Sequence, residues 1–260
     1  MPAWSVQLVK VGESEVRGPE AFWMDRWEEW VTLFFYVLVL RSPGRTIVLN
    51  AGPPDDLSAI NRVWSGYLGG ERGALRVADG ERLPVALAAH GVDAADVDTV
   101  LLTPLTAYTT GRLDLFERAQ LCISRAAWLD LLAPPGGANP AVDRSIAIHE
   151  PALVHLVTDW WPRVRLLADE DEVAPGITVF RAGVHQRGTL AVVIETEHGT
   201  VVYSDAAYRR GNVENAHPIG LARSLDEAHA SYARIAHTAD IFLPAFEPGL
   251  LDEFPDGRVA

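Results

Sequence analysis

A run of ten apolar residues, Val31 to Leu40, limits most strongly how this chain folds. The run is rich in β-branched and aromatic residues, which favour a strand, and it lacks the alternation of a strand with one wet face. It is far shorter than the roughly 20 residues that a membrane-spanning helix needs. We therefore expect a strand that is covered on both faces inside a layered domain.

The rest of the chain alternates between short apolar runs and amphipathic segments. The turn Ser42-Pro-Gly44 predicts a returning strand over 45–49. Further strands are expected over 97–103, 119–123, 164–167, 177–181, 190–196, 200–204 and 239–243. Helices are expected over 83–90, 124–132 and 224–236, with Ser124 and Ser224 as N-caps. This order predicts an α/β fold in a single domain, residues 1–260.

The composition excludes several classes of partner. Lys and Arg number 22 and Asp and Glu 35, which gives a formal net charge of −13 that repels nucleic acid. No basic segment followed by an apolar one stands at the N-terminus, so we expect neither a secretory signal nor membrane attachment. The single cysteine, Cys122, lies in an apolar run and indicates a buried thiol. These features favour a cytoplasmic location.

Five loops that each follow an expected strand carry the polar and aromatic residues of greatest interest. They are Asn50-Ala-Gly52, the segment from Thr103 to Gly111, the segment from Gly183 to Gly188, Ser204-Asp-Ala-Ala-Tyr208, and Leu243-Pro-Ala-Phe-Glu-Pro248. Their order and their flanking strands resemble the metallo-β-lactamase superfamily, and within it the N-acyl homoserine lactonase branch. The resemblance spans about residues 31–260 and implies an αββα four-layer sandwich.

The departures from that family bear on function. The family's metal-ligand positions would fall on Pro104, Thr106, Tyr108 and Thr109, and its last histidine on Phe246. None of these is a metal ligand. The supporting aspartate of the first turn falls on Asn50, and only His185 and Asp205 remain of the set. Zinc needs three or four N, S or O⁻ ligands held together, so we expect no metal cofactor.

The other histidines do not rebuild such a site. His149 and His155 are six residues apart, and His229 and His237 are eight apart. Neither spacing places two rings on one helical face. We expect these side chains to be solvated or to make single hydrogen bonds. The sequence also has no Gly-x-Ser-x-Gly segment, so the usual serine nucleophile is missing.

Four residues are candidates for residual chemistry. His185 is a candidate base, because an imidazole exchanges protons near neutral pH. Asp205 needs a partner for its charge, and His185 is the obvious one. Tyr208 matches the tyrosine that touches the substrate carbonyl in the resembled branch, and Tyr108 is a second hydroxyl for an oxyanion. The alternative is that His185 and Asp205 only stabilise their loops and that Tyr208 is an ordinary half-buried tyrosine.

The remaining replacements predict a pocket that is polar but uncharged. Thr106, Thr109 and Asn50 offer neutral donors and acceptors, while Phe246 adds apolar surface. Such a pocket suits a small, mostly apolar ligand with a few polar anchors. Separately, Trp23, Trp27 and Trp30 have the spacing of one helical face. We interpret them as core, the alternatives being a dimer contact or a pocket wall.

Three functions remain open from the sequence. The first is a pseudoenzyme that does not hydrolyse through zinc and that binds a small ligand or an active paralogue. The second is a metal-independent hydrolase or lyase that acts on a lactone, ester or related carbonyl compound through His185, Asp205 and Tyr208. The third is an interaction subunit with a collapsed pocket. A homodimer and a heterodimer with a paralogue are both compatible with the sequence. An open pocket would favour the first two functions.

Overall fold

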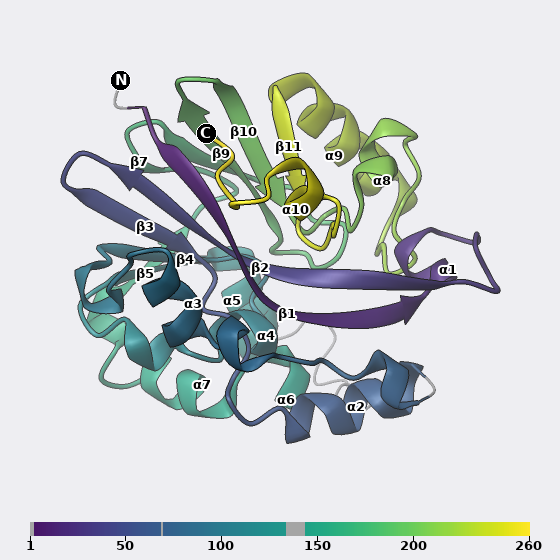
Figure 1. Ribbon diagram of the computed structural model, residues 1–260, viewed down its shortest axis with the longest axis horizontal. Coiled ribbons are helices and arrows are strands. Elements are labelled where there is room, and N and C mark those ends of the chain that lie inside the picture. The colour runs from purple at the N-terminus through teal and green to yellow at the C-terminus, as the bar shows by residue number, and fades with distance from the viewer. Residues whose placement is uncertain (1–2, 69, 134–143) are drawn as a thin grey trace.

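The computed structural model describes residues 3–68, 70–133 and 144–260, and its strands form two sheets (Figure 1). The six-stranded sheet has the order β1 (Ser5–Arg17), β2 (Trp30–Ser42), β3 (Arg45–Leu49), β4 (Thr99–Leu102), β5 (Gln120–Ser124), β6 (Val164–Leu167). The five-stranded sheet has the order β11 (Ile241–Pro244), β10 (Gly199–Ser204), β9 (Leu190–Thr196), β8 (Ile177–Arg181), β7 (Glu170–Ala174).

Helices lie outside the two sheets, so the chain is an αββα sandwich (Figure 1). On the side of the six-stranded sheet are α2 (Ser58–Leu68), α3 (Leu83–Ala89), α4 (Ala107–Thr110), α5 (Arg125–Leu132), α6 (Arg144–Ala147) and α7 (Glu150–Leu156). Near the five-stranded sheet are α8 (Arg210–Glu214), α9 (Leu225–Thr238) and α10 (Leu250–Glu253). The short α1 (Gly18–Ala21) follows β1. The four-layer fold expected from the sequence is confirmed.

The mostly apolar run Val31 to Leu40 lies within β2. Residues 35–40 are all at most 4% exposed, so both faces of the strand are covered as expected. The strand pairs antiparallel with β3, with Leu38 opposite Leu49 and Leu40 opposite Ile47. It also pairs with β1 along a long hairpin that contains a bulge between Lys10 and Gly12.

The parallel strands bring the loops of interest to one edge. Strands β3, β4, β5 and β6 pair in parallel, and so do β10 and β11 in the other sheet. The carboxyl ends of parallel strands meet at the same edge, which is where α/β folds usually place a site. The loops after β3 and β4 therefore lie near one another, and those after β10 and β11 do likewise.

Several local expectations are confirmed and others are wrong. Ser124 caps α5 by accepting a hydrogen bond from the Ala127 amide, and Ser224 caps α9 in the same way. The prediction that the three tryptophans share one helical face in the core is wrong. Residues 22–29 form turns and bends, Trp23 and Trp27 are 41% and 61% exposed, and Trp30 begins β2. Strands β1 and β7 and helix α2 were not expected from the sequence.

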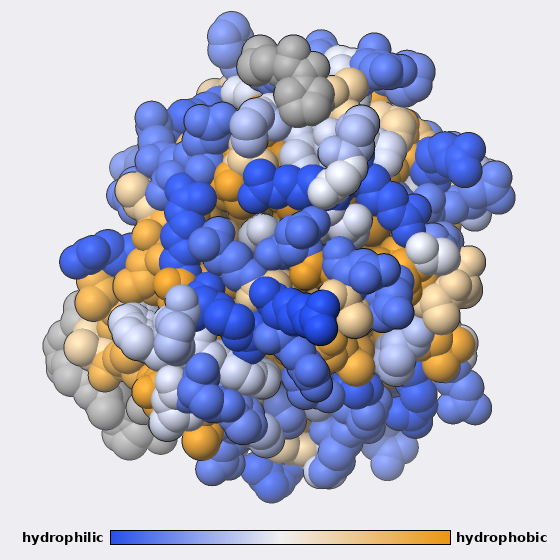
Figure 2. All heavy atoms as spheres, turned by 90° about the vertical axis from the view of Figure 1, so that its left-hand side faces the viewer, coloured by the Kyte–Doolittle hydropathy of each residue, from blue (hydrophilic) through white to orange (hydrophobic). Residues whose placement is uncertain are grey.

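One face of the surface is mostly hydrophilic. Figure 2 shows one face on which hydrophilic side chains dominate and hydrophobic ones are scattered between them. Within the described part of the chain, no helix has the length and apolar character needed to cross a bilayer. Cys122 is fully buried, and burial raises the pKa of its thiol to about 11, so it is unreactive as expected.

Candidate functional site

A cavity of about 380 Å³ lies between the elements that carry the strand-end loops. Most of its wall is apolar and comes from β1, β2, α2 and the loop before α9. Its lining residues are Ser14, Val16, Glu20, Leu33, Phe35, Val63, Trp64, Tyr67, Leu68, Thr106, Tyr108, Ile146, His185, Gln186, Tyr208, Leu221 and Phe246. Small-molecule sites in proteins are concave, mostly apolar and of this size.

The fold gathers most of the residues singled out in the sequence. Thr106, Tyr108, His185, Tyr208 and Phe246 all line the cavity. The other three lie behind its wall. Asp205 is bonded to His185, while Asn50 and Thr109 are buried and engaged in hydrogen bonds within and between loops.

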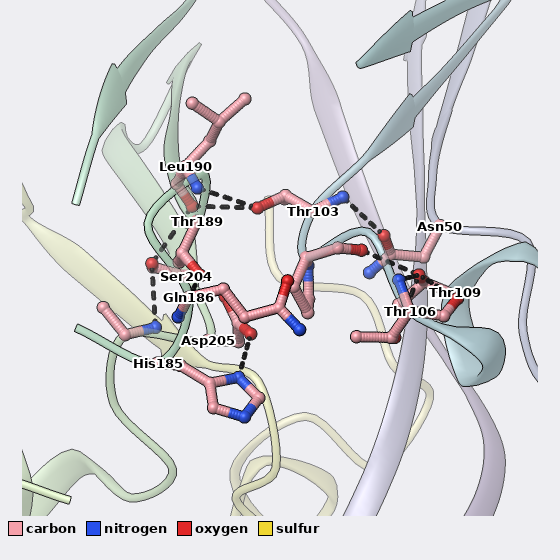
Figure 3. Close-up of polar contacts among 12 residues, drawn as sticks. Asn50, Thr103, Thr106, Thr109, His185, Gln186, Thr189, Leu190, Ser204 and Asp205 are labelled. Atoms are coloured by element: carbon pink, nitrogen blue, oxygen red, sulfur yellow. Dashed lines mark hydrogen bonds and ion pairs between the residues drawn. The ribbon is translucent and has the colours of Figure 1, made fainter. Parts of the chain in front are cut away.

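His185 and Asp205 form a directly bonded pair (Figure 3). Nδ1 of His185 is 2.8 Å from Oδ2 of Asp205, and the two side chains are 14% and 0% exposed. Within the described residues, the second carboxylate oxygen, Oδ1, is buried without a hydrogen-bond partner. Because the carboxylate occupies Nδ1, Nε2 is the ring nitrogen left for a ligand. The expected His–Asp pair is thus present in the structure.

The loop after β8 holds His185 in a fixed position. Gly183 and Val184 both have positive φ, 63° and 67°, and for the β-branched Val184 this conformation is strained. Hydrogen bonds hold the loop in this strained conformation. The Val184 amide donates to Glu227 Oε2 at 3.2 Å, and the Thr189 amide donates to the Gln186 carbonyl at 3.0 Å. Glu227 also accepts from Arg181 at 2.7 Å.

Aromatic rings form a continuous wall from α2 to His185. The ring of Phe35 lies 5.9 Å from that of Trp64 and 5.1 Å from that of Phe246. Phe246 packs edge-to-face against Tyr208 at 4.8 Å, and Tyr208 against His185 at 5.6 Å. Edge-to-face packing at these separations is favourable and fixes the orientation of each ring.

The two tyrosines of this wall keep their protons at neutral pH. Burial raises the pKa of Tyr108 well above its usual value, and the Asp205 charge adds to the effect. Burial likewise raises the pKa of Tyr208, with Tyr108 and Glu20 contributing next. The Tyr108 hydroxyl is buried without a hydrogen bond of good geometry in the described structure, although nearby Thr106 lowers its pKa. Both phenols are therefore neutral donors.

The loops after β3 and β4 are held by neutral groups (Figure 3). Asn50 Oδ1 accepts from the Thr103 amide at 2.9 Å, and Asn50 Nδ2 donates to the Tyr203 hydroxyl at 3.3 Å. Thr109 Oγ1 donates to the Pro104 carbonyl at 2.7 Å and accepts from the Thr106 amide at 3.1 Å. Thr109 thus satisfies the backbone of its own loop, while Asn50 links the loop after β3 to the loop after β4 and to β10.

Glu20 is a site residue that sequence reasoning missed. It lies in α1, lines the cavity, and its side chain makes no hydrogen bond within the described structure. Burial raises the pKa of its carboxyl to about 7, an effect that the nearby His185 opposes. Its neighbours Gly18 and Pro19 indicate only a turn, so no local pattern marks this carboxyl as part of a site.

Comparison with solved structures identifies the fold. An N-acyl homoserine lactone hydrolase with N-hexanoyl-L-homoserine at its catalytic metal center matches with a TM-score of 0.80 and 16% identity, over 100% of both chains. A mutant of B. thuringiensis AiiA with bound N-decanoyl-L-homoserine matches with a TM-score of 0.79 and 16% identity, also over 100% of both chains. A hydrolase of the beta lactamase superfamily matches with a TM-score of 0.65 and 14% identity, over 98% of this chain and 89% of the hydrolase chain.

The chain has the metallo-β-lactamase fold. No protein-family model and no curated protein matches its sequence. Identities of 14–16% establish this fold and not an activity. The lactonase-like resemblance seen in the strand-end loops therefore has its counterpart among the solved structures that match this chain.

The residues present do not fit the metal that this fold often holds. Zinc sites use three or four N, S or O⁻ donors. Here His185 and Asp205 are the only such donors at the expected positions, and Thr109 uses its hydroxyl within its own loop. Within residues 3–68, 70–133 and 144–260, no group of three His, Cys, Asp or Glu side chains is placed to hold a metal ion. No step through a metal is derived for this site.

Proposed function

We propose that the chain binds a small, mostly apolar molecule in this cavity and does not hydrolyse it through zinc. The observation that carries the proposal is the open cavity of about 380 Å³, walled by aliphatic and aromatic side chains. It lies where the strand-end loops converge, which is the expected place for a ligand in this fold. An open cavity favours a ligand-binding protein over an interaction subunit with a collapsed pocket.

The polar groups of the cavity are few and fixed. His185 is held by Asp205, and Tyr208 carries a neutral phenol, whereas the Tyr108 hydroxyl is buried and only the ring of this residue can contribute to the wall. A ligand oxygen placed near these groups would receive hydrogen bonds, while its apolar part would contact Leu33 and Phe35. A few oriented polar anchors in an apolar pocket are the usual basis of small-molecule recognition.

Calorimetric titration with N-hexanoyl-L-homoserine lactone tests the proposal, because structures that share this fold bind compounds with that acyl chain. We expect saturable binding to the wild-type chain. Val63→Trp fills the cavity from α2 and should abolish binding, while a matched change outside the cavity, Val85→Trp on α3, should not. Equal binding by wild type and Val63→Trp would place the ligand elsewhere and refute the proposal.

A second candidate function rests on the His185–Asp205 hydrogen bond of 2.8 Å. An imidazole oriented by a carboxylate is a general base, and two buried phenols are suitable oxyanion donors. The chain would then open lactones or cleave esters without a metal. Slow turnover of the same lactone in the presence of a chelator, lost in His185→Ala, would support this function. Binding without turnover leaves the first proposal alone.

A further inference from the structure

Few charged groups line the cavity. Of the described residues that line it, none is Lys or Arg, while Glu20 contributes a carboxyl group. The carboxylate of Asp205 lies behind His185 and is bonded to it. An anionic ligand such as a carboxylate would therefore find no basic side chain among these lining residues to balance its charge.

Aromatic rings surround the same space. Six of the described lining residues are aromatic apart from His185: Phe35, Trp64, Tyr67, Tyr108, Tyr208 and Phe246. The faces of such rings carry partial negative charge and attract organic cations, Trp most strongly. An aromatic cage with one carboxylate is the usual recognition chemistry for quaternary ammonium groups.

Glu20 lies at the end of this aromatic wall. Its charge acts on Tyr67 at the rim and on Tyr208 inside the cavity, and His185 faces it from the loop after β8. No hydrogen bond within the described structure occupies its carboxyl. A carboxyl that is partly buried without a partner is costly, and a bound cation would supply the missing charge.

We propose that the cavity is specific for an organic cation, an amine or quaternary ammonium group on an apolar chain, with Glu20 as its counter-ion and the aromatic wall as its cage. This inference rests on the proposed function, since it names the ligand class of the same cavity. The apolar chain of the ligand would lie against Leu33 and Leu68, and the cationic head between Trp64 and Glu20.

Three probes with the same six-carbon chain test the charge preference: hexyltrimethylammonium, 1-hexanol and hexanoate. Titrations at pH 8.5 keep the Glu20 carboxyl ionised, because its pKa is about 7. We expect the cation to bind about tenfold or more tightly than the alcohol, given an ion pair and cation–π contacts. Hexanoate should bind most weakly of the three.

Matched variants assign the preference to residues. Glu20→Gln keeps the shape of the side chain and should reduce the cation's advantage over the alcohol to about threefold or less, while alcohol binding stays the same. Glu28→Gln removes the same charge from an exposed position outside the cavity and should change nothing. Trp64→Leu should weaken binding of the cation more than binding of the alcohol. Circular dichroism verifies that each variant is folded.

The outcomes separate the two proposals. If the alcohol binds and the cation binds no more tightly, the cation preference is wrong and the proposed function stands. A cation preference that survives in Glu20→Gln also overturns this inference, because the charge would then act from elsewhere. If neither the cation nor the alcohol binds, and N-hexanoyl-L-homoserine lactone does not bind either, the proposed function fails and the cation preference fails with it.

Discussion

Two halves of the site wall differ in how their polar groups are satisfied. The threonine half consists of the loops after β3 and β4, residues 50–54 and 103–111. The ionisable half consists of the loops after β8 and β10, residues 182–189 and 205–209. In the threonine half, Asn50 accepts from the Thr103 amide in the neighbouring loop, and Thr109 bonds within its own loop. In the ionisable half, Asp205 relies on one histidine and has a second oxygen without a described partner.

The neutral side chains of the threonine half are engaged in hydrogen bonds inside the protein. The buried carboxylate of the ionisable half still needs a positive or hydrogen-bonding partner, which His185 supplies. The threonine half is joined to the start of β9, next to the ionisable half, by Thr103 Oγ1, which accepts from the Leu190 amide at 2.9 Å. The ionisable half should therefore be the more sensitive to substitution.

The largest effect is expected for His185→Ala. The change leaves Asp205 fully buried without its partner, and breaking a well-buried pair costs about 3–5 kcal/mol. The free energy of unfolding, measured by urea denaturation at pH 7, should fall by this amount. His185→Ala combined with Asp205→Asn should recover much of the loss, because the stranded charge is removed as well.

The matched control for this variant is an exposed pair of the same type. His155 Nδ1 lies 2.9 Å from Asp159 Oδ1, with side chains 47% and 63% exposed. His155→Ala should cost less than about 1 kcal/mol, because water screens exposed ion pairs. Equal losses at the two positions would show that burial of Asp205 is not what makes the first pair matter.

The next effect concerns Glu20 and depends on pH. Burial raises the pKa of Glu20 from 4.5 to about 7 in the folded chain, so its ionisation opposes folding. The stability gained from the protonated carboxyl is complete below pH 4.5 and is lost as the pH rises through 7. A pKa shift of one unit corresponds to about 1.4 kcal/mol, so the shift of Glu20 from 4.5 to about 7 corresponds to a loss of stability of about 3 kcal/mol.

Glu20→Gln removes this titration and leaves a neutral side chain of the same shape. We expect the variant and the wild type to have similar unfolding free energies at pH 4.5. At pH 8.5 the variant should be the more stable, by up to about 3 kcal/mol. Urea denaturation at both values measures the difference. Parallel stability curves for the two proteins would show that the Glu20 carboxyl is well solvated and would remove it from the site.

A smaller effect, independent of pH, is expected in the threonine half. Thr109→Val keeps the side-chain shape but leaves the Thr106 amide and the Pro104 carbonyl without their partner. Such buried losses cost about 1–3 kcal/mol. Thr238→Val removes a hydroxyl that is bonded to the Arg234 carbonyl at the exposed end of α9. Its cost should be less than about 1 kcal/mol, because water can replace the lost partner there. If the loss of unfolding free energy in Thr109→Val depended strongly on pH, this would contradict the neutral character of the threonine half.

The sequence predicts the fold well because its strands carry strong local signals. The strand bounds 45–49, 164–167, 177–181 and 190–196 coincide with β3, β6, β8 and β9. Strand β1 was missed because polar residues such as Glu13 and Ser14 interrupt its apolar pattern, and its pairing with β2 is tertiary. The tryptophan spacing was misleading because α1 ends at Ala21, and Met24 and Arg26 have positive φ, 56° and 55°, which interrupts any helix across these residues.

The candidate site was predictable in part for the same reason. His185, Asp205 and Tyr208 stand directly after strands, so the topology of the fold brings them together. Glu20 and Trp64 come from a short turn helix and from an unexpected helix, and they reach the cavity only through tertiary packing. No spacing in the sequence relates either residue to His185.

The smallest effect, an absence of change, is expected on metal removal. The chain keeps two of the donors that zinc needs, and hydrogen bonds such as those of Thr103 with Leu190 and of Asn50 with Tyr203 connect its two sheets. The core consists of apolar side chains from both sheets, so folding does not depend on a metal as it does in a zinc finger. The melting midpoint should be the same with and without a chelator, and elemental analysis should find well below one zinc, iron or manganese ion per chain. A midpoint that falls by several degrees on chelation, or a stoichiometric metal, would mean that the ionisable half recruits further ligands, and the comparison drawn between the two halves would then fail.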